Sequence, residues 1–212
     1  MPTPRPSNRA ALTAVRSYLH PNRTPTIRKG ASKLAIATNT HRPLAGEHSP
    51  YYSTYIDQVP PGDILTHLAE QLERTTSLLK DLTPEQAAFR PTPTDWSVKE
   101  VVCHISDSER IFSYRALRIA RADPTPLPGF DQEPYVPASG ADSRPLADLL
   151  AEFAAVRQAT LWLFRSLPSE AWTRLGTASD SPVSVRALAY IIAGHENHHV
   201  RSLKEEYLHP TP

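Results

Sequence analysis

Four stretches of the chain place apolar residues at steps of three and four, which is the repeat of an amphipathic helix. They cover about residues 63–79, 97–121, 145–166 and 184–207. Polar residues fill the intervening positions, and no segment of strand length alternates between apolar and polar residues. The pattern therefore predicts an all-α fold in which four long helices form a four-helix bundle.

Capping residues mark where three of these helices begin. Asp63 and Ser184 directly precede apolar stretches, and Ser97 with Glu100 has the spacing of a capping box. Residues 122–144 are rich in Pro, Gly and Asp and predict a long connection between the second and third helices. A connection of this length in a compact domain is usually functional, so we expect it to shape the mouth of a pocket.

Shorter segments are expected to be helical as well. Thr83-Pro84-Glu85-Gln86 has proline at the first helical position and predicts a short helix. A further turn of helix is expected at Ser169–Thr173, and the folded part should begin near Tyr51.

Two histidines lie on the apolar face of the last predicted helix. His195 and His199 continue the stripe that runs from Val185 to Leu203. Residues four apart on a helix have Cβ atoms about 5–6 Å apart, so both imidazoles point the same way. A polar side chain in the interior of a bundle needs a partner, and a transition metal explains two histidines at this spacing best.

A zinc-type site usually takes at least three ligands from the protein. The best third candidate is His104 on the second predicted helix, beside the apolar stripe that contains Val102 and Ile105. Three histidines would leave one coordination position open, as in catalytic sites. Imidazole suits Zn, Ni, Cu and Fe alike, so the residues do not select the metal.

Residues near these histidines leave alternatives open. Glu109 could orient a histidine or act as a base, but pairing with a nearby arginine is favoured, and Asp107 could hold the His104 ring. His198 lies about 100° around the helix from His199 and is expected outside the ligand set. Cys103 is expected to be buried and inert.

Three arginines, Arg115, Arg118 and Arg121, repeat every three residues on the second predicted helix. They could bind an anionic substrate, but a solvated helix face is the favoured interpretation.

Two motifs together resemble the DinB-like superfamily, whose YfiT-type members are proposed metal-dependent enzymes. The first runs from Trp96-Ser-Val-Lys-Glu to His104 and Arg110, and the second is Gly194-His-Glu-Asn-His-His199. The resemblance covers about residues 50–208. It implies an up-down-down-up four-helix bundle in which His104, His195 and His199 bind a divalent metal, most often Zn or Ni.

The resemblance also suggests a reaction class. Some relatives are thiol S-transferases that use small cellular thiols. We therefore expect a metal-dependent hydrolase or thiol S-transferase that acts on a small molecule, with a low-molecular-weight thiol as one candidate. The alternative is a non-catalytic metal-binding or stress-response module in which the metal is structural. A homodimer is compatible with the bundle, but no particular residue indicates one.

Charge divides the chain near residue 46. Residues 1–50 hold eight of the 23 Lys and Arg residues but a single acid, Glu47. Residues 1–46 are also rich in Pro, Ser and Thr, and we expect a disordered extension, with a short helix at Arg9–Leu19, before a domain at 47–212. A nucleic-acid-binding tail, a transit peptide and a functionless extension remain open, and the last is favoured.

Composition bears on disulfides, on the type of metal site and on the cellular compartment. The single cysteine excludes an internal disulfide and a cysteine-rich zinc site, and it fits a reducing, cytoplasmic environment. No apolar run approaches the roughly 18 residues of a membrane span. The predicted domain is acidic, so nucleic acid is not an expected partner.

Overall fold

The computed structural model describes residues 41–208. The expectations for the basic extension, including the helix at Arg9–Leu19, lie almost wholly outside these residues. Residues 41–46 belong to the described part, where the Arg42 guanidinium donates hydrogen bonds of 2.6 Å to the carbonyl oxygens of Ile56 and Val59.

Four long helices form the bundle, as the apolar pattern predicts. They are α3 (Ile64–Leu79), α5 (Val98–Ala120), α7 (Leu146–Arg165) and α8 (Val185–Ser202). The predicted caps are confirmed: Asp63 accepts from the Thr66 amide at 2.8 Å, Ser97 and Glu100 form a reciprocal capping box, and Ser184 accepts from the Ala187 amide.

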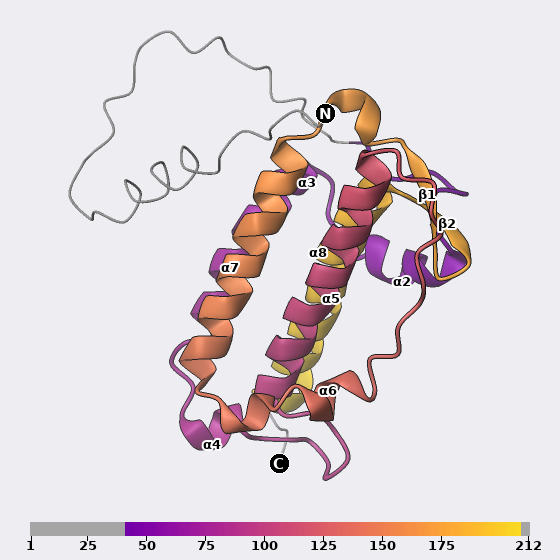
Figure 1. Ribbon diagram of the computed structural model, residues 1–212. Coiled ribbons are helices and arrows are strands. Elements are labelled where there is room, and N and C mark those ends of the chain that lie inside the picture. Colours follow the sequence, from indigo (N-terminus) through magenta and orange to yellow (C-terminus); the bar gives the residue numbers. More distant parts are fainter. Residues whose placement is uncertain (1–40, 209–212) are drawn as a thin grey trace, which may run out of the picture. The chain divides into compact units, whose positions relative to one another are not determined.

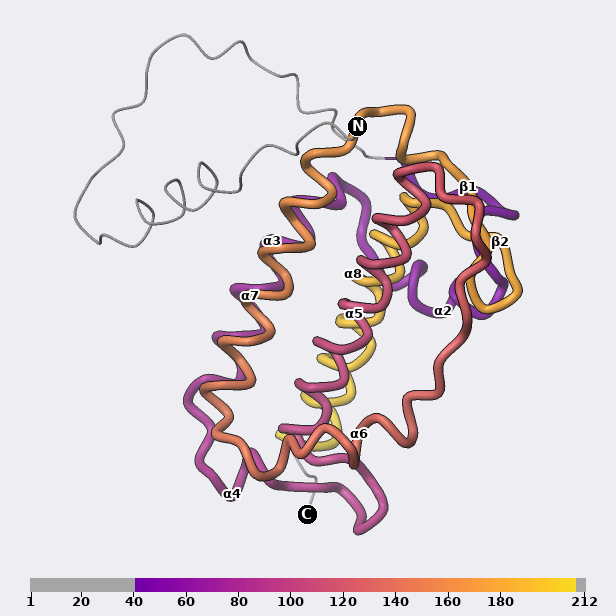
Figure 2. Tube along the Cα trace, viewed as in Figure 1, coloured from indigo at the N-terminus to yellow at the C-terminus, as the bar shows by residue number. Residues whose placement is uncertain are grey.

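The helix directions follow the up-down-down-up order. In Figure 1, α3 and α8 run one way along the bundle, whereas α5 and α7 both run the other way. The tube in Figure 2 shows that the connection between the parallel helices α5 and α7 returns along the whole length of the bundle. Each of α3 and α5 packs against both α7 and α8.

The long connection at 122–144 is only partly irregular. It contains α6 (Tyr135–Ala138) and the 3₁₀ turn η3 (Ala141–Ser143). Near its start, Leu127 exchanges backbone hydrogen bonds with Thr177 and Ser179 at 2.9 and 3.0 Å. The connection is thereby attached to a segment close to the start of α8.

That segment holds two short strands, which corrects the expectation that the chain has none. β1 (Leu175–Ala178) and β2 (Ser181–Ser184) are antiparallel, with Leu175 opposite Ser184. The two-residue turn between them, Ser179-Asp180, has positive φ at both residues. Such turns usually carry glycine, and four-residue strands are too short to show alternation, so the sequence pattern gave no signal.

Small helices complete the described chain. η2 (Pro50–Tyr52) and α2 (Ser53–Ile56) precede the bundle, and α4 (Pro84–Ala87) forms where the Thr83-Pro84 signal predicts it. η4 (Ser169–Ala171) is the expected turn after α7, and η5 (Leu203–Tyr207) extends α8 by a π-helical segment. No helix within residues 41–208 combines the length and apolarity needed to cross a membrane.

A buried charge network joins all four long helices in the bundle interior. Arg157 of α7 makes paired hydrogen bonds to Glu109 of α5 and donates to Glu196 of α8 at 2.6 Å. On α3, the Leu68 carbonyl accepts from Arg157 at 2.9 Å, and the Thr75 hydroxyl donates to Glu196 at 2.6 Å. The three charged side chains are at most 2% exposed, so they depend on one another for compensation.

Gly194 sets how closely α2 approaches α8. A Cβ at this position would overlap the carbonyl group of Tyr55, which is backbone and cannot rotate away. We expect Gly194→Ala to destabilise the fold by about 2 kcal/mol, because the strain of overpacking exceeds the roughly 1 kcal/mol that alanine gains in a helix. Chemical denaturation of the two proteins measures this difference.

Gly129→Ala is the matched control. A Cβ there would meet the Ser179 side chain at an ordinary 3.5 Å, so stability should change by less than about 0.5 kcal/mol. Equal stabilities for the two variants would contradict the close approach of α2 to α8.

Candidate metal centre

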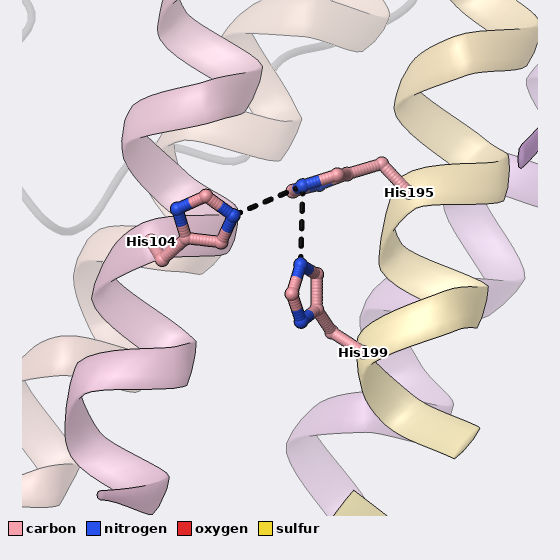
Figure 3. Close-up of side chains that lie close together, drawn as sticks. All are labelled: His104, His195 and His199. Atoms are coloured by element: carbon pink, nitrogen blue, oxygen red, sulfur yellow. Dashed lines mark hydrogen bonds between the residues drawn. The ribbon is translucent and has the colours of Figure 1, made fainter. Parts of the chain in front are cut away.

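Three imidazoles converge in the space between α5 and α8. His104 comes from α5, and His195 and His199 lie one turn apart on α8 (Figure 3). The Nε2 atom of His195 lies 3.1 Å from Nε2 of His104 and 3.2 Å from Nε2 of His199. The structure thus brings together the three histidines that the sequence selects.

Burial keeps these rings neutral. His104 and His195 are 7% and 6% exposed, and His199 is partly buried. Burial lowers the pKa of His104 to about 4 and that of His199 to about 3, and it holds the pKa of His195 well below its ordinary value. Neutral imidazoles retain the lone pairs that metal binding requires.

Hydrogen bonds alone do not account for this geometry. A ring nitrogen carries either one proton or one lone pair, so Nε2 of His195 cannot make good hydrogen bonds to both neighbours at once. One cation between the three atoms satisfies all three lone pairs. Tetrahedral Zn with bonds of 2.0–2.1 Å would separate its ligand nitrogens by about 3.3 Å, close to the two observed distances. The three residues therefore fit a divalent metal.

Aromatic rings hold the histidines in place. The indole of Trp96 lies 4.7 Å from the His104 ring between centroids. The rings of Tyr55 and Phe112 pack steeply inclined against the His195 ring, with centroids 5.4 and 6.1 Å away. These contacts restrict the rotation of the imidazoles, so their orientation is set before any ligand binds.

All three histidines line one cavity of about 310 Å³. Its other walls are mainly aromatic, with three polar side chains, Ser108, Gln132 and Ser179, among them. The aromatic residues are Tyr51, Tyr52, Tyr55, Trp96, Phe112 and Phe130. The imidazole cluster therefore borders a space large enough for a small molecule.

The acidic residues near the histidines have other partners. Asp107 accepts from Arg110 at 2.9 Å. Glu109 is held by Arg157 of α7, so it has the arginine partner that the sequence favoured, but it is buried within α5 and not at a helix end. Cys103 is buried, which raises the pKa of its thiol, and it is not part of the cluster. His198 packs against the Tyr55 ring at the side of the cluster.

Sequence reasoning missed two features of this region. One is Arg157, although a charged residue four positions from both Phe153 and Leu161 on an apolar stripe was a usable signal. The other is the group of tyrosines from η2 and α2, for which no local pattern exists because tertiary packing brings them to the histidines.

The expectation that the three arginines of α5 form a solvated face is wrong for one of them. Arg115 is only 2% exposed and donates from Nη2 to the Pro128 carbonyl at 2.8 Å and to the Ser179 hydroxyl at 3.1 Å. The connection after α5 and the β1–β2 turn cover it. Arg118 pairs with Asp123, and Arg121 is exposed, as expected for a solvated face.

Comparisons with known proteins agree with this fold. The solved structure of YfiT from Bacillus subtilis, described as a probable metal-dependent hydrolase with an unusual four-helix bundle topology, is similar with a TM-score of 0.58. The two chains share 15% identity, and the similarity covers 78% of this chain and 90% of that one. At this identity the similarity concerns the fold alone.

A search of curated proteins found no match. A family model for the DinB superfamily matches residues 67–203, which is more than half of the chain. The chain belongs to the DinB superfamily.

Proposed function

We propose that the protein is a metal-dependent hydrolase of small molecules, with His104, His195 and His199 as the ligands of one divalent metal, Zn or Ni. The observation that carries the proposal is that three neutral Nε2 atoms converge at the wall of an aromatic cavity. The description of YfiT as a probable metal-dependent hydrolase supports the same reaction class.

The cluster favours a catalytic over a structural metal. Structural zinc sites are closed by four protein ligands, whereas catalytic sites keep a position for water or substrate. Within residues 41–208, no Cys, Asp, Glu or fourth His joins His104, His195 and His199 in one cluster. All three histidines line the same cavity, so a substrate in that cavity would lie beside a metal that they hold.

The residues that line the cavity indicate which chemical roles the protein side chains would have. A divalent metal would supply Lewis acidity, which makes a water or a thiol nucleophilic near neutral pH. Among the described residues, no Asp or Glu lines the cavity, so no carboxylate stands there as a general base. The hydroxyls of Ser108 and Ser179 and the amide of Gln132 are placed to orient a substrate, and the aromatic walls exclude water.

An activity screen tests this proposal. Metal-loaded protein should hydrolyse some members of a panel of small esters and amides, and His104→Ala should lower the rate by at least about a hundredfold. His67→Ala, which removes a histidine outside the cluster, should leave the rate unchanged.

Repeating the panel with low-molecular-weight thiols distinguishes hydrolysis from thiol transfer by the product formed. Turnover that is unaffected by chelation and by His104→Ala would contradict the proposal.

A further inference from the structure

We propose that the cavity takes substrates that carry a carboxylate, and that Arg115 is the residue that binds it. The inference rests on the proposed function in that it concerns the same cavity. It assigns to Arg115 the recognition of an anionic group at a distance from the three histidines.

Arg115 is buried without a counter-ion. Its side chain is 2% exposed, and no Asp or Glu in residues 41–208 forms a salt bridge with it. Residues 1–40 and 209–212 contain no Asp or Glu, so every acidic side chain of this sequence belongs to the described part. A guanidinium that is almost wholly buried with neutral partners only is costly, because its charge has lost most of the solvation of water.

The hydrogen-bonding capacity of Arg115 is also only partly used. Both of its hydrogen bonds come from Nη2 and go to neutral oxygens of Pro128 and Ser179. A guanidinium has five N–H donors, and within residues 41–208 neither Nε nor Nη1 has a hydrogen-bond partner. A carboxylate could accept from these two atoms and neutralise the charge at the same time.

Arg157, which is also deeply buried, has its positive charge compensated by acidic partners. Arg157 is 0% exposed, and two carboxylates and a carbonyl share its donors. The exposed end of α5 follows the same rule, since Arg118 pairs with Asp123. Arg115 precedes both of these arginines in the chain, and within residues 41–208 it lacks the acidic partner that each of them has.

The position of Arg115 connects it to the cavity. Its guanidinium carbon lies 5.8 Å from the ring centroids of both Phe112 and Phe130, and its Nη2 bonds to Ser179. All three of these residues line the cavity that contains the histidines. Arg115 itself does not line the cavity and lies directly behind these three wall residues, so a carboxylate would bind it after their side chains move aside.

Helix geometry separates Arg115 from the histidine cluster along α5. His104, Ser108, Phe112 and Arg115 follow one another at steps of four, four and three, so they share a face of α5. Eleven residues correspond to about 16 Å along the helix axis, and the arginine side chain leans back toward the N-terminal end, where His104 lies. The favoured substrate is thus elongated, with a carboxylate at one end, an apolar body, and the reacting group at the other end.

Ligand binding by full-length protein tests the proposal with two probes of similar size that differ in one terminal group, a charged carboxylate or a neutral amide. The probes are 4-phenylbutyrate and its neutral amide, and titrations are followed by NMR after chelation of metal and again after loading with Zn²⁺. We expect wild-type protein to bind the carboxylate at least about tenfold more tightly than the amide in both states. Arg115→Met should abolish this preference.

One further variant separates the charge of Arg115 from a general effect of losing a positive charge. Arg121→Met removes an exposed arginine from the end of the same helix and should retain the preference. Thermal unfolding of each variant verifies that it is folded before its binding is compared.

The outcomes separate this inference from the proposed function. The role of Arg115 would be overturned, with the metal site intact, if Arg115→Met still preferred the carboxylate. It would also be overturned if the preference existed only in the Zn-loaded state and did not depend on Arg115. Equal affinity for both probes, or no binding of the carboxylate by wild-type protein, would also overturn it. Failure of the histidine cluster to bind either Zn²⁺ or Ni²⁺ would refute the proposed function, while the comparison in the chelated state would still decide the role of Arg115.

Discussion

Replacing Arg157 with methionine is expected to lower the free energy of unfolding by about 3–5 kcal/mol, the cost of breaking a buried ion pair by removing one partner. The change leaves Glu109 and Glu196 buried at 2% and 1% exposure without their shared cation. It also removes the hydrogen bond to the Leu68 carbonyl of α3. Because the network joins all four long helices, the loss should affect the whole bundle, and chemical denaturation measures it.

Arg165→Met provides the comparison for this prediction. Arg165 lies on the same helix but is exposed, so its replacement should change stability by less than about 0.5 kcal/mol. A loss below about 1 kcal/mol for Arg157→Met would show that the carboxylates find other compensation, and the account of the buried network would be wrong.

Replacing His195 with alanine is expected to weaken Zn²⁺ binding by more than about a hundredfold. Loss of a group that merely supports a ligand costs 10–100-fold, and loss of a ligand itself should cost more. His195 is central, since its Nε2 is within 3.2 Å of both other nitrogens. Competition with a chromophoric chelator measures the affinity directly.

The same variant should lose the stabilisation that metal confers. At a free Zn²⁺ concentration of about 100 times the dissociation constant, wild-type protein should gain about 2.7 kcal/mol in unfolding free energy, and His195→Ala should gain almost none. His67→Ala should behave as wild type, because His67 contacts the Pro61 carbonyl and is not in the cluster. Equal stabilisation of wild type and His195→Ala would contradict the assignment of His195.

Most of the bundle was predictable because its signals are local. The periodic apolar residues and the caps at Asp63, Ser97 and Ser184 act within one or two turns of helix, and the observed helices begin where these signals place them. The short strands were not predictable in this way. Their turn at Ser179-Asp180 lacks glycine, and the attachment of Leu127 to this segment depends on contacts far apart in sequence.

The candidate site shows the same difference between local signals, which could be predicted, and tertiary contacts, which could not. His195 and His199 share a helix, so their common direction follows from spacing. His104 was the best third candidate because it borders the apolar stripe of the second predicted helix, and the motif resemblance implied the same residue. The environment of the site is a tertiary property. Tyr55 reaches His195 only because Gly194 lets α2 approach α8 closely. Arg115 has the spacing of a solvated face, and it is buried because the connection after α5 folds back over it.

The metal content of full-length protein purified without a nickel column tests the central claim most directly. Elemental mass spectrometry is run on wild-type protein and on His199→Ala, each as purified and after incubation with Zn²⁺ or Ni²⁺ and removal of excess. The three-histidine site predicts about one metal per chain in wild type and its loss in the variant. Wild-type protein that holds no metal even after incubation would contradict the account, and His104, His195 and His199 would then be buried histidines without a metal-binding role.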